Sequence, residues 1–275
     1  MTGFPTGFPY AEVIGDPIAH SKSPIIHKFW LDKLGINADY RMFHVKPDEL
    51  PDYIAGRRDD PDWRGCNVTI PHKLAVMDLV SDPGEVRTSI GAMNTVARTE
   101  DGELFGTNTD AGGFFAPIAD VPLKGQDVIV IGAGGAAQAV LFALSRIGVG
   151  SVTIINRNVL KASALLARFG LKGQALEHGS PLPSARLLVN ASALGMTGQD
   201  ELIVDLSPLP DDAIVYDLVY APLKTKLLKA AKGRDLDTID GLSMLIGQAA
   251  VAFEIFFDQA PPLEHDEELR KLLLK

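Results

Sequence analysis

The fold is decided by a short stretch that joins an apolar run to a glycine-rich turn: Val128-Ile129-Val130-Ile131-Gly132-Ala133-Gly134-Gly135-Ala136-Ala137. Four consecutive apolar residues are typical of a strand that is buried on both faces. After the turn, apolar residues recur at helical spacing until Gly148, a natural helix stop. The order strand, glycine turn, helix predicts the first unit of a doubly wound α/β sheet.

The turn has the spacing G-x-G-x-x-A, and each small residue has a separate physical reason. Gly132 permits the tight turn, Gly134 lets the backbone approach a pyrophosphate, and Ala137 lets helix and strand pack closely. The N–H groups at the positive end of the following helix would then face the phosphate. We therefore assign dinucleotide binding to the turn residues Gly132, Ala133, Gly134, Gly135 and Ala136.

The end of the next predicted strand, residues 152–155, indicates which dinucleotide is bound. Chains that bind NAD usually carry Asp or Glu there for the ribose hydroxyl. This chain has no carboxylate at that point, and a guanidinium there can bind a 2′-phosphate and stack on the adenine. The sequence therefore predicts NADP(H), held by Asn156, Arg157, Asn158 and Lys161.

Strand-like and helix-like segments alternate on both sides of this unit. Strands are expected at 11–15, 40–45, 66–70, 187–189 and 214–219, and helices from Ser23 as N-cap, over 71–80 and over 242–257. Asp101-Gly102 between two extended runs predicts a hairpin. The alternation predicts an α/β chain with an N-terminal substrate domain on a mostly parallel sheet and a C-terminal Rossmann domain. The expected boundaries are 1–110 with 242–275 for the substrate-binding and catalytic domain, and 111–241 for the Rossmann domain.

Composition limits the classes of function. The chain has 275 residues and a formal net charge of -9, which argues against nonspecific nucleic-acid binding. Its single cysteine, Cys66, excludes an internal disulfide, fits a cytoplasmic setting and is interpreted as a buried apolar residue. No apolar run approaches the ~20 residues of a membrane span. The opening repeat, Thr2-Gly3-Phe4-Pro5 and Thr6-Gly7-Phe8-Pro9, is interpreted as a mobile arm.

Short hydroxyl and amide side chains follow the predicted strands of the first half, at the positions where open α/β sheets bind ligands. They are Ser21, Ser23, Thr69, Asn94 and Asn108, and Lys73 stands close by. Local sequence alone leaves other interpretations open, because the serines could be turn and cap residues, Lys73 a solvated lysine, and the asparagines hairpin caps. His20 and His72 are interpreted as local hydrogen-bonding or solvent-facing residues, since no metal-ligand spacing joins them.

Several ordered motifs together resemble the shikimate dehydrogenase family. The opening motif is Gly15-Asp16-Pro17-Ile18-Ala19-His20-Ser21-Lys22-Ser23-Pro24. The others span the chain as far as residue 248: Asn67-Val68-Thr69-Ile70-Pro71-His72-Lys73, Gly91-Ala92-Met93-Asn94-Thr95, Asn108-Thr109-Asp110, Asn190-Ala191-Ser192, Gly195-Met196, Asp217-Leu218-Val219-Tyr220 and Gly241-Leu242-Ser243-Met244-Leu245.

The resemblance implies an activity and a role for each matching residue. The activity is the reversible NADPH-dependent reduction of 3-dehydroshikimate to shikimate on the route to chorismate, in a cytoplasmic monomer or homodimer without a metal. Lys73 and Asp110 would form the catalytic pair, and Ser21 and Ser23 would hold the substrate carboxylate. The remaining substrate contacts would be Thr69, Asn94, Asn108, Asp110, Tyr220 and Gln248, and further cofactor contacts Ser192, Gly241 and Met244.

Three alternatives stay open at this point. The first is a quinate or quinate/shikimate dehydrogenase that uses NAD, although the Ser21-Lys22-Ser23 pair resembles the shikimate-preferring form. The second is a relative that acts on aminoshikimate. The third is a regulatory module that binds a cofactor without catalysis, against which the presence of both Lys73 and Asp110 argues.

Overall fold

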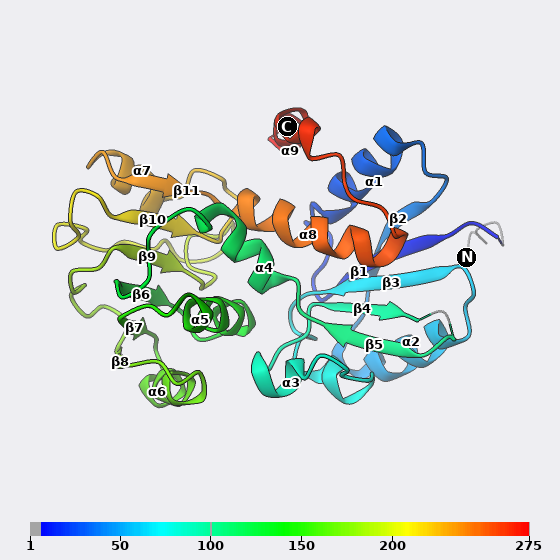
Figure 1. The fold of residues 1–275 in the computed structure, drawn as a ribbon, viewed down its shortest axis with the longest axis horizontal. Helices are drawn as coiled ribbons and strands as arrows, with labels where there is room; N and C mark the ends of the chain where they lie inside the picture. The colour runs from blue at the N-terminus through cyan, green and yellow to red at the C-terminus, as the bar shows by residue number, and fades with distance from the viewer. Residues whose placement is uncertain (1–6, 100, 275) are drawn as a thin grey trace. The chain divides into compact units, whose positions relative to one another are not determined.

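The computed structural model describes residues 7–99 and 101–274, in two compact units (Figure 1). Unit 1 comprises Met1–Thr109 and Gln248–Lys275, and unit 2 comprises Asp110–Gly247. The chain passes between them before Asp110 and again inside the helix α8 (Gly241–Phe257). The first copy of the opening repeat, residues 2–5, lies outside the described residues.

Unit 1 is built on a five-stranded sheet with the order β2-β1-β3-β4-β5. The strands β1 (Tyr10–Gly15), β2 (Asp39–His44) and β3 (Trp63–Val68) are parallel. The strands β4 (Thr95–Arg98) and β5 (Leu104–Thr107) form an antiparallel hairpin, as Asp101-Gly102 predicts. The other elements are α1 (Ser23–Leu34), η1 (Pro47–Glu49), α2 (Leu50–Arg58), η2 (Ala75–Asp78), α3 (Val86–Ser89), η4 (Leu263–His265) and α9 (Asp266–Leu273).

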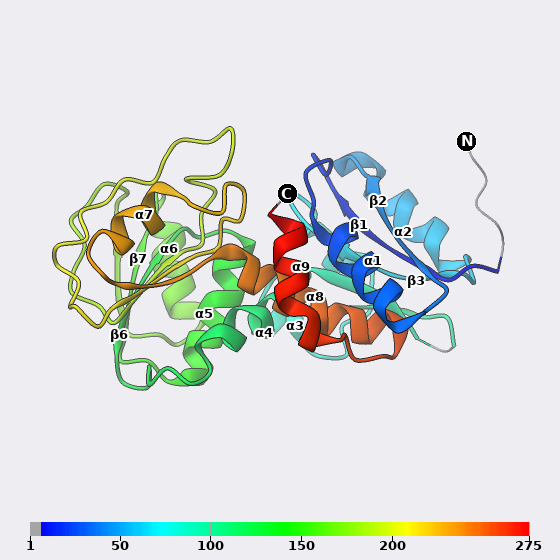
Figure 2. The same ribbon diagram turned by 90° about the horizontal axis from the view of Figure 1, so that it is seen from above.

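Helices cover both faces of the unit 1 sheet. On one face lie α1 and the second half of α8 (Figures 1 and 2). They share an aromatic cluster, in which the rings of Trp30 and Phe253 lie 5.5 Å apart. A Cβ on Gly65 of β3 would lie 2.5 Å from the Phe256 ring, so only glycine lets α8 approach the sheet this closely. Cys66, the next residue, is fully buried, as the sequence predicts.

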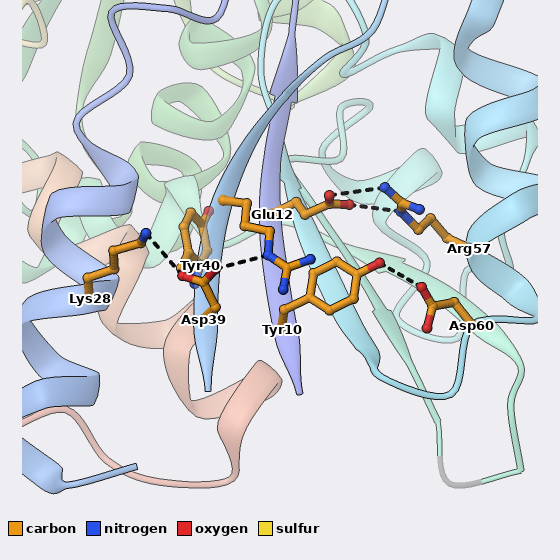
Figure 3. Close-up of polar contacts among 8 residues, drawn as sticks. Tyr10, Glu12, Lys28, Asp39, Tyr40, Arg57 and Asp60 are labelled. Atoms are coloured by element: carbon orange, nitrogen blue, oxygen red, sulfur yellow. Dashed lines mark hydrogen bonds and ion pairs between the residues drawn. The ribbon is translucent and has the colours of Figure 1, made fainter. Parts of the chain in front are cut away.

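On the other face α2 is joined to β1 by a buried ion pair. Glu12 of β1 accepts hydrogen bonds from Arg57 of α2 at 2.9 and 3.0 Å (Figure 3). It also accepts one from the Tyr53 hydroxyl at 2.7 Å. The Glu12 side chain is only 2% exposed. Because a buried carboxylate needs partners for its charge, this pair ties the helix to the sheet in one arrangement.

Unit 2 contains a six-stranded sheet with the order β11-β10-β9-β6-β7-β8. Every strand pair is parallel, and the order reverses between β6 and β9, which is the doubly wound arrangement that the glycine turn predicts. The strands are β6 (Asp127–Ile131), β7 (Ser151–Ile155), β8 (Gly173–Leu176), β9 (Leu187–Asn190), β10 (Ile214–Asp217) and β11 (Asp237–Ile239). The helices are α4 (Asp110–Phe115), η3 (Ala116–Ile118), α5 (Gly135–Ile147), α6 (Val159–Arg168) and α7 (Lys226–Lys232).

The unit 2 sheet is apolar on both faces because helices cover both. Val128 and Val130 of β6 join the core that includes side chains of α4, α5 and α6. Ile129 and Ile131 alternate to the opposite core, which includes side chains of α7. The continuous apolar run that the sequence shows here is therefore a strand buried on both sides. Within residues 7–99 and 101–274, no helix combines the length and hydropathy that a membrane span requires.

Two local predictions are wrong. The segment 71–80 is a series of turns and the short η2, because the Lys73 carbonyl accepts a hydrogen bond from Met93 N at 2.9 Å and is withdrawn from helical pairing. Ser23 is the first residue of α1 rather than its cap. Lys22 occupies the cap position, and the Ser21 hydroxyl oxygen accepts from Ser23 N at 3.3 Å.

Candidate active site and cofactor site

Most of the predicted substrate residues of unit 1 meet at one edge of its sheet. Thr69 and Asn108 follow the carboxyl ends of β3 and β5, and Asn94 precedes the antiparallel β4, so all three lie at the same edge. Backbone hydrogen bonds join the three segments, from Val68 N to Asn94 O at 2.7 Å and from Asn94 N to Thr107 O at 3.1 Å. The edge therefore gathers hydroxyl and amide groups that are far apart in the sequence.

The segment that carries Lys73 is fixed to this edge from three sides. Thr69 N donates to Ile14 O of β1 at 3.0 Å, and Met93 N donates to the Lys73 carbonyl oxygen at 2.9 Å. The His72 Nε2 lies 2.7 Å from Val45 O, so the buried imidazole has a structural hydrogen bond, to a residue 27 positions away rather than to a local one. With its backbone held this way, the half-buried Lys73 side chain projects from a rigid segment.

Asn94 is the centre of a buried polar cluster. Its Nδ2 donates to Thr109 Oγ1 at 2.9 Å and to Gln248 Oε1 at 3.4 Å, while its Oδ1 accepts from Thr109 N at 2.7 Å. Asn94, Thr109 and Gln248 are all buried. The cluster connects the end of the hairpin to α8, so two predicted substrate residues, Asn94 and Gln248, are held by one network.

The network continues through residues that the sequence analysis did not assign. Thr95 Oγ1 donates to Asn94 Oδ1 at 3.1 Å and accepts from Asn67 Nδ2 at 3.1 Å. The Tyr40 hydroxyl donates to Asn67 Oδ1 at 2.6 Å, and burial raises the pKa of Tyr40 well above its usual value, which keeps it a donor. Thr95, Thr109 and Asn67 lie inside the sequence motifs quoted above, and those motifs could have pointed to them. Tyr40 lies in no such motif.

The remaining unit 1 residues have local contacts at the same edge. Asn108 Nδ2 donates to Ala92 O at 2.7 Å, and Ser23 is buried at the start of α1. The Ser21 hydroxyl is half-buried in the turn before α1. In this contact the Ser21 hydroxyl oxygen accepts, so its hydroxyl proton can still be donated to a ligand.

In unit 2 the glycine turn presents backbone rather than side chains. Gly132 has φ +112°, and a Cβ there would lie 2.8 Å from the Ala191 carbonyl oxygen. Gly134 is the N-cap of α5, and a Cβ there would meet no atom within 4 Å. The first glycine is thus required by the fold, whereas the space beside the second can hold a ligand. Backbone N–H groups at the start of a 13-residue helix fit a pyrophosphate.

The end of β7 carries the predicted 2′-phosphate site. Asn156 Nδ2 donates to Asn158 O at 2.9 Å, and Asn158 Oδ1 accepts from Lys161 N at 2.9 Å as the N-cap of α6. This closes the loop so that Arg157 and Lys161 are both exposed on it. Two cations and a helix N-terminus, with no carboxylate between 156 and 161, fit a phosphate group better than a ribose hydroxyl.

The loops after β9 and β10 are held by a second buried network. Ser192 Oγ donates to Asn190 Oδ1 at 2.7 Å, and Asn190 Nδ2 donates to Asp217 Oδ1 at 2.8 Å. The Thr225 hydroxyl donates to Asp217 Oδ2 at 2.6 Å, yet burial still raises the pKa of Asp217 above its ordinary value. The network holds the loop that contains Ser192. This loop lies beside Gly132, because the atoms nearest to a Cβ on Gly132 belong to Ala191 and Ser192.

Two other predicted cofactor residues have packing roles in unit 2. A Cβ on Gly241 would lie 2.4 Å from the Leu218 carbonyl oxygen, so glycine is needed where α8 begins. Met244 lies in the core cluster of α5 and α6. Tyr220 is half-buried, and burial raises the pKa of its hydroxyl.

The predicted substrate and catalytic residues are divided between the two units. Asp110 and Tyr220 belong to unit 2, and Asp110 is the buried first residue of α4. Unit 1 contains Ser21, Ser23, Thr69, Lys73, Asn94, Asn108 and Gln248. In the part of the chain that the structure describes, no group of three or more His, Cys, Asp or Glu side chains is placed to hold a metal.

Family models match three parts of the chain. Residues 13–96 match the shikimate dehydrogenase substrate binding domain, residues 117–187 match shikimate / quinate 5-dehydrogenase, and residues 241–269 match the shikimate 5′-dehydrogenase C-terminal domain. A curated shikimate dehydrogenase (NADP(+)) from Sphingopyxis alaskensis is 66% identical over 270 residues, which are 98% of each chain.

Solved structures agree over the whole chain. A shikimate 5-dehydrogenase from Thermus thermophilus, in complex with NADP(H) and shikimate, is 36% identical with a TM-score of 0.85, covering 97% of this chain and 100% of that one. A ligand-free 5-ketofructose reductase of a Gluconobacter species is 31% identical with a TM-score of 0.87, covering 98% and 100%. Similarity in fold thus extends to an enzyme named for a different substrate.

Proposed function

The chain belongs to the shikimate dehydrogenase family, and on that premise we propose that it catalyses the reversible NADP-dependent interconversion of 3-dehydroshikimate and shikimate. The observation that carries the proposal is the sheet edge of unit 1. There Lys73, on a fixed segment after β3, is gathered with the hydroxyl of Thr69 and with the buried amide of Asn94, which donates to Gln248 of α8. Such a set suits a ring substrate that carries several hydroxyls and one carbonyl.

Unit 2 is proposed as the cofactor unit. NADPH, when bound, supplies the hydride that adds to the ring carbonyl carbon. The open space beside Gly134 and the N-terminus of α5 would hold the pyrophosphate, and Arg157 with Lys161 would hold the 2′-phosphate. Asn156 and Asn158 hold the loop that contains Arg157 and Lys161, and Ser192 would line the cofactor site beside Gly132.

Lys73 is proposed as the proton donor. An ammonium next to the carbonyl oxygen stabilises the negative charge that develops there and then supplies the proton that completes the hydroxyl group. In the direction of shikimate oxidation, the same amine takes up the hydroxyl proton. The pairing of Lys73 with Asp110 stays a prediction, because it rests on the resemblance of the two motifs.

Unit 1 is proposed as the substrate unit. The carboxylate would lie against Ser21 and Ser23, and the ring hydroxyls against Thr69, Asn94, Asn108 and Gln248, with Tyr220 as a further contact. The predicted domains, 1–110 with 242–275 and 111–241, would take these two roles, although Asp110 and residues 242–247 belong to unit 2. A cytoplasmic location and a monomeric or homodimeric state also stay predictions.

The test is a steady-state comparison of four substrate pairs: shikimate and quinate, each with NADP and with NAD. The proposal expects the highest kcat/KM for shikimate with NADP. A higher value for quinate, or for NAD, would move the chain to the quinate-oxidising activity that one family description also names. No turnover of any pair by a folded protein that binds NADP would contradict the substrate assignment and favour another polyol.

A further inference from the structure

Lys22 stands between the two serines proposed to hold the substrate carboxylate, yet its side chain is bonded elsewhere. Its Nζ donates to the carbonyl oxygen of Leu273, in the last turn of α9. Its own carbonyl accepts hydrogen bonds from Ile25 N at 3.1 Å and Ile26 N at 3.2 Å, as the N-cap residue of α1. Lys22 therefore connects the start of one helix to the end of another.

The helix α9 is docked along α1 (Figure 2). Leu269 and Leu273 of α9 are buried, and at the far end of α1 Lys33 Nζ lies 2.7 Å from Glu268 Oε2. A cation at the C-terminus of a helix also meets the negative end of the helix dipole, which favours the Lys22 contact electrostatically. The two lysines thus attach α9 to opposite ends of α1.

We propose that Lys22 is a positioning residue, which uses the docked α9 to hold Ser21 and Ser23 in the geometry that binds the substrate carboxylate. The proposal rests on the proposed function of those two serines. The Lys22 backbone, with φ -90° and ψ -4°, sets the directions of the residues on both sides of it. When its side chain is anchored, the turn is ordered before the substrate arrives, so binding does not have to order it.

The direct alternative is that Lys22 itself binds the carboxylate. The described geometry does not favour it, because the Nζ of Lys22 is bonded to the Leu273 carbonyl oxygen. The two roles differ in one respect that can be measured. A positioning lysine needs a docked α9, whereas a lysine that binds the substrate does not.

The first experiment is Lys22→Met. We expect the KM for shikimate to rise about tenfold, because substrate binding must then order the released turn, while kcat and the KM for NADP stay within about twofold. Lys22→Arg, which keeps a donor of similar reach, should recover most of the affinity. Lys33→Met is the matched control, because it removes an exposed ion pair between α1 and α9 while the buried leucines keep α9 docked, and it should leave the KM for shikimate unchanged.

The second experiment combines Lys22→Met with Leu269→Ala, which loosens α9 in the full chain. If Lys22 acts through α9, Leu269→Ala alone raises the KM for shikimate, and adding Lys22→Met raises it little further. Effects on KM that multiply would overturn the positioning role. Leu273→Ala is the milder variant to use if Leu269→Ala does not yield folded protein, as judged by thermal unfolding.

Failure of the inference is distinguishable from failure of the proposed function. A wild-type chain that oxidises shikimate, together with a Lys22→Met variant of unchanged KM, overturns only the role of Lys22. A wild-type chain that neither oxidises shikimate nor binds it in calorimetric titration overturns the proposed function, and the inference with it.

Discussion

The two units contain sites of different construction. In unit 2 the proposed cofactor site is mainly backbone, in a single turn where Gly132 is required by the fold and Gly134 leaves space. In unit 1 the proposed substrate site is made of side chains that come from several strand ends and from α8, and buried hydrogen bonds join them. A site made of backbone can be located from one motif, whereas a site made of side chains depends on the strand register and on residues behind it.

The largest expected effect concerns Lys73, the proposed proton donor of unit 1. Lys73→Ala should lower kcat by about 10³-fold, within the range for a lost proton donor, with little change in the KM for shikimate. Steady-state kinetics with saturating NADP measures both. The exposed Lys46→Ala is the control. A near-wild-type kcat in Lys73→Ala would remove Lys73 from the mechanism.

The next effect concerns the stability of unit 1. Glu12→Ala leaves Arg57 partly buried without its carboxylate, so the free energy of unfolding should fall by about 3 kcal/mol. Asp78→Asn, which breaks the exposed pair with Arg87, should cost under about 1 kcal/mol. Urea unfolding of both variants makes the comparison. Equal losses of unfolding free energy would mean that the buried pair stabilises the protein no more than an exposed ion pair does.

In unit 2 the side chain expected to matter most for cofactor choice is Arg157, at the proposed 2′-phosphate site. Arg157→Ala should raise the KM for NADP about 30-fold, as for the loss of a hydrogen bond between charged groups, and leave the KM for NAD unchanged. The ratio of kcat/KM values for the two cofactors is the measurement. An unchanged ratio would place the 2′-phosphate away from Arg157.

The two glycines of the turn should separate binding from folding. Gly134→Ala should raise the KM for NADP about tenfold without loss of thermal stability, because its Cβ meets no protein atom but occupies ligand space. Gly132→Ala should lower both affinity and stability, since its Cβ would press on the Ala191 carbonyl at a positive φ. Loss of stability in Gly134→Ala would show that the space beside it is not free.

The most gradual effect is a pH dependence that comes from His27 in unit 1. Burial lowers the pKa of His27 from 6.5 to about 3. Between these values the unfolded chain binds a proton that the native chain does not, so the free energy of unfolding falls as the pH falls. The slope from His27 should approach about 1 kcal/mol per pH unit between pH 6 and 4. In His27→Gln this slope should disappear, and parallel curves for the two chains would contradict the assignment.

Sequence reasoning predicted the features that are local. The strand ending at Ile131, the turn from Gly132 and the hairpin at Asp101-Gly102 each depend on neighbouring residues, and each is present. The segment 71–80 was predicted as a helix and is not one. The segment is not helical because Met93 N, twenty residues further along the chain, donates a hydrogen bond to the Lys73 carbonyl oxygen.

The same limit applies to the site. The motifs point to Asn94 and Gln248, but they do not reveal that Thr95, Asn67 and Tyr40 connect behind Asn94. Those contacts exist only when β1, β2, β3 and the hairpin are paired in their observed registers. The role of Lys22 was similarly hidden, because its partner lies 251 positions further along the chain.

The division of labour between the units can be tested most directly by hydrogen–deuterium exchange with each ligand alone. Shikimate should slow exchange in the unit 1 segments around Ser21–Ser23, Thr69–Lys73 and Asn94. NADP should slow it in the unit 2 segments around Gly132–Ala137 and Asn156–Lys161. Protection of the glycine turn by shikimate, or of the Thr69–Lys73 segment by NADP without change in unit 2, would contradict the proposed assignment of substrate and cofactor.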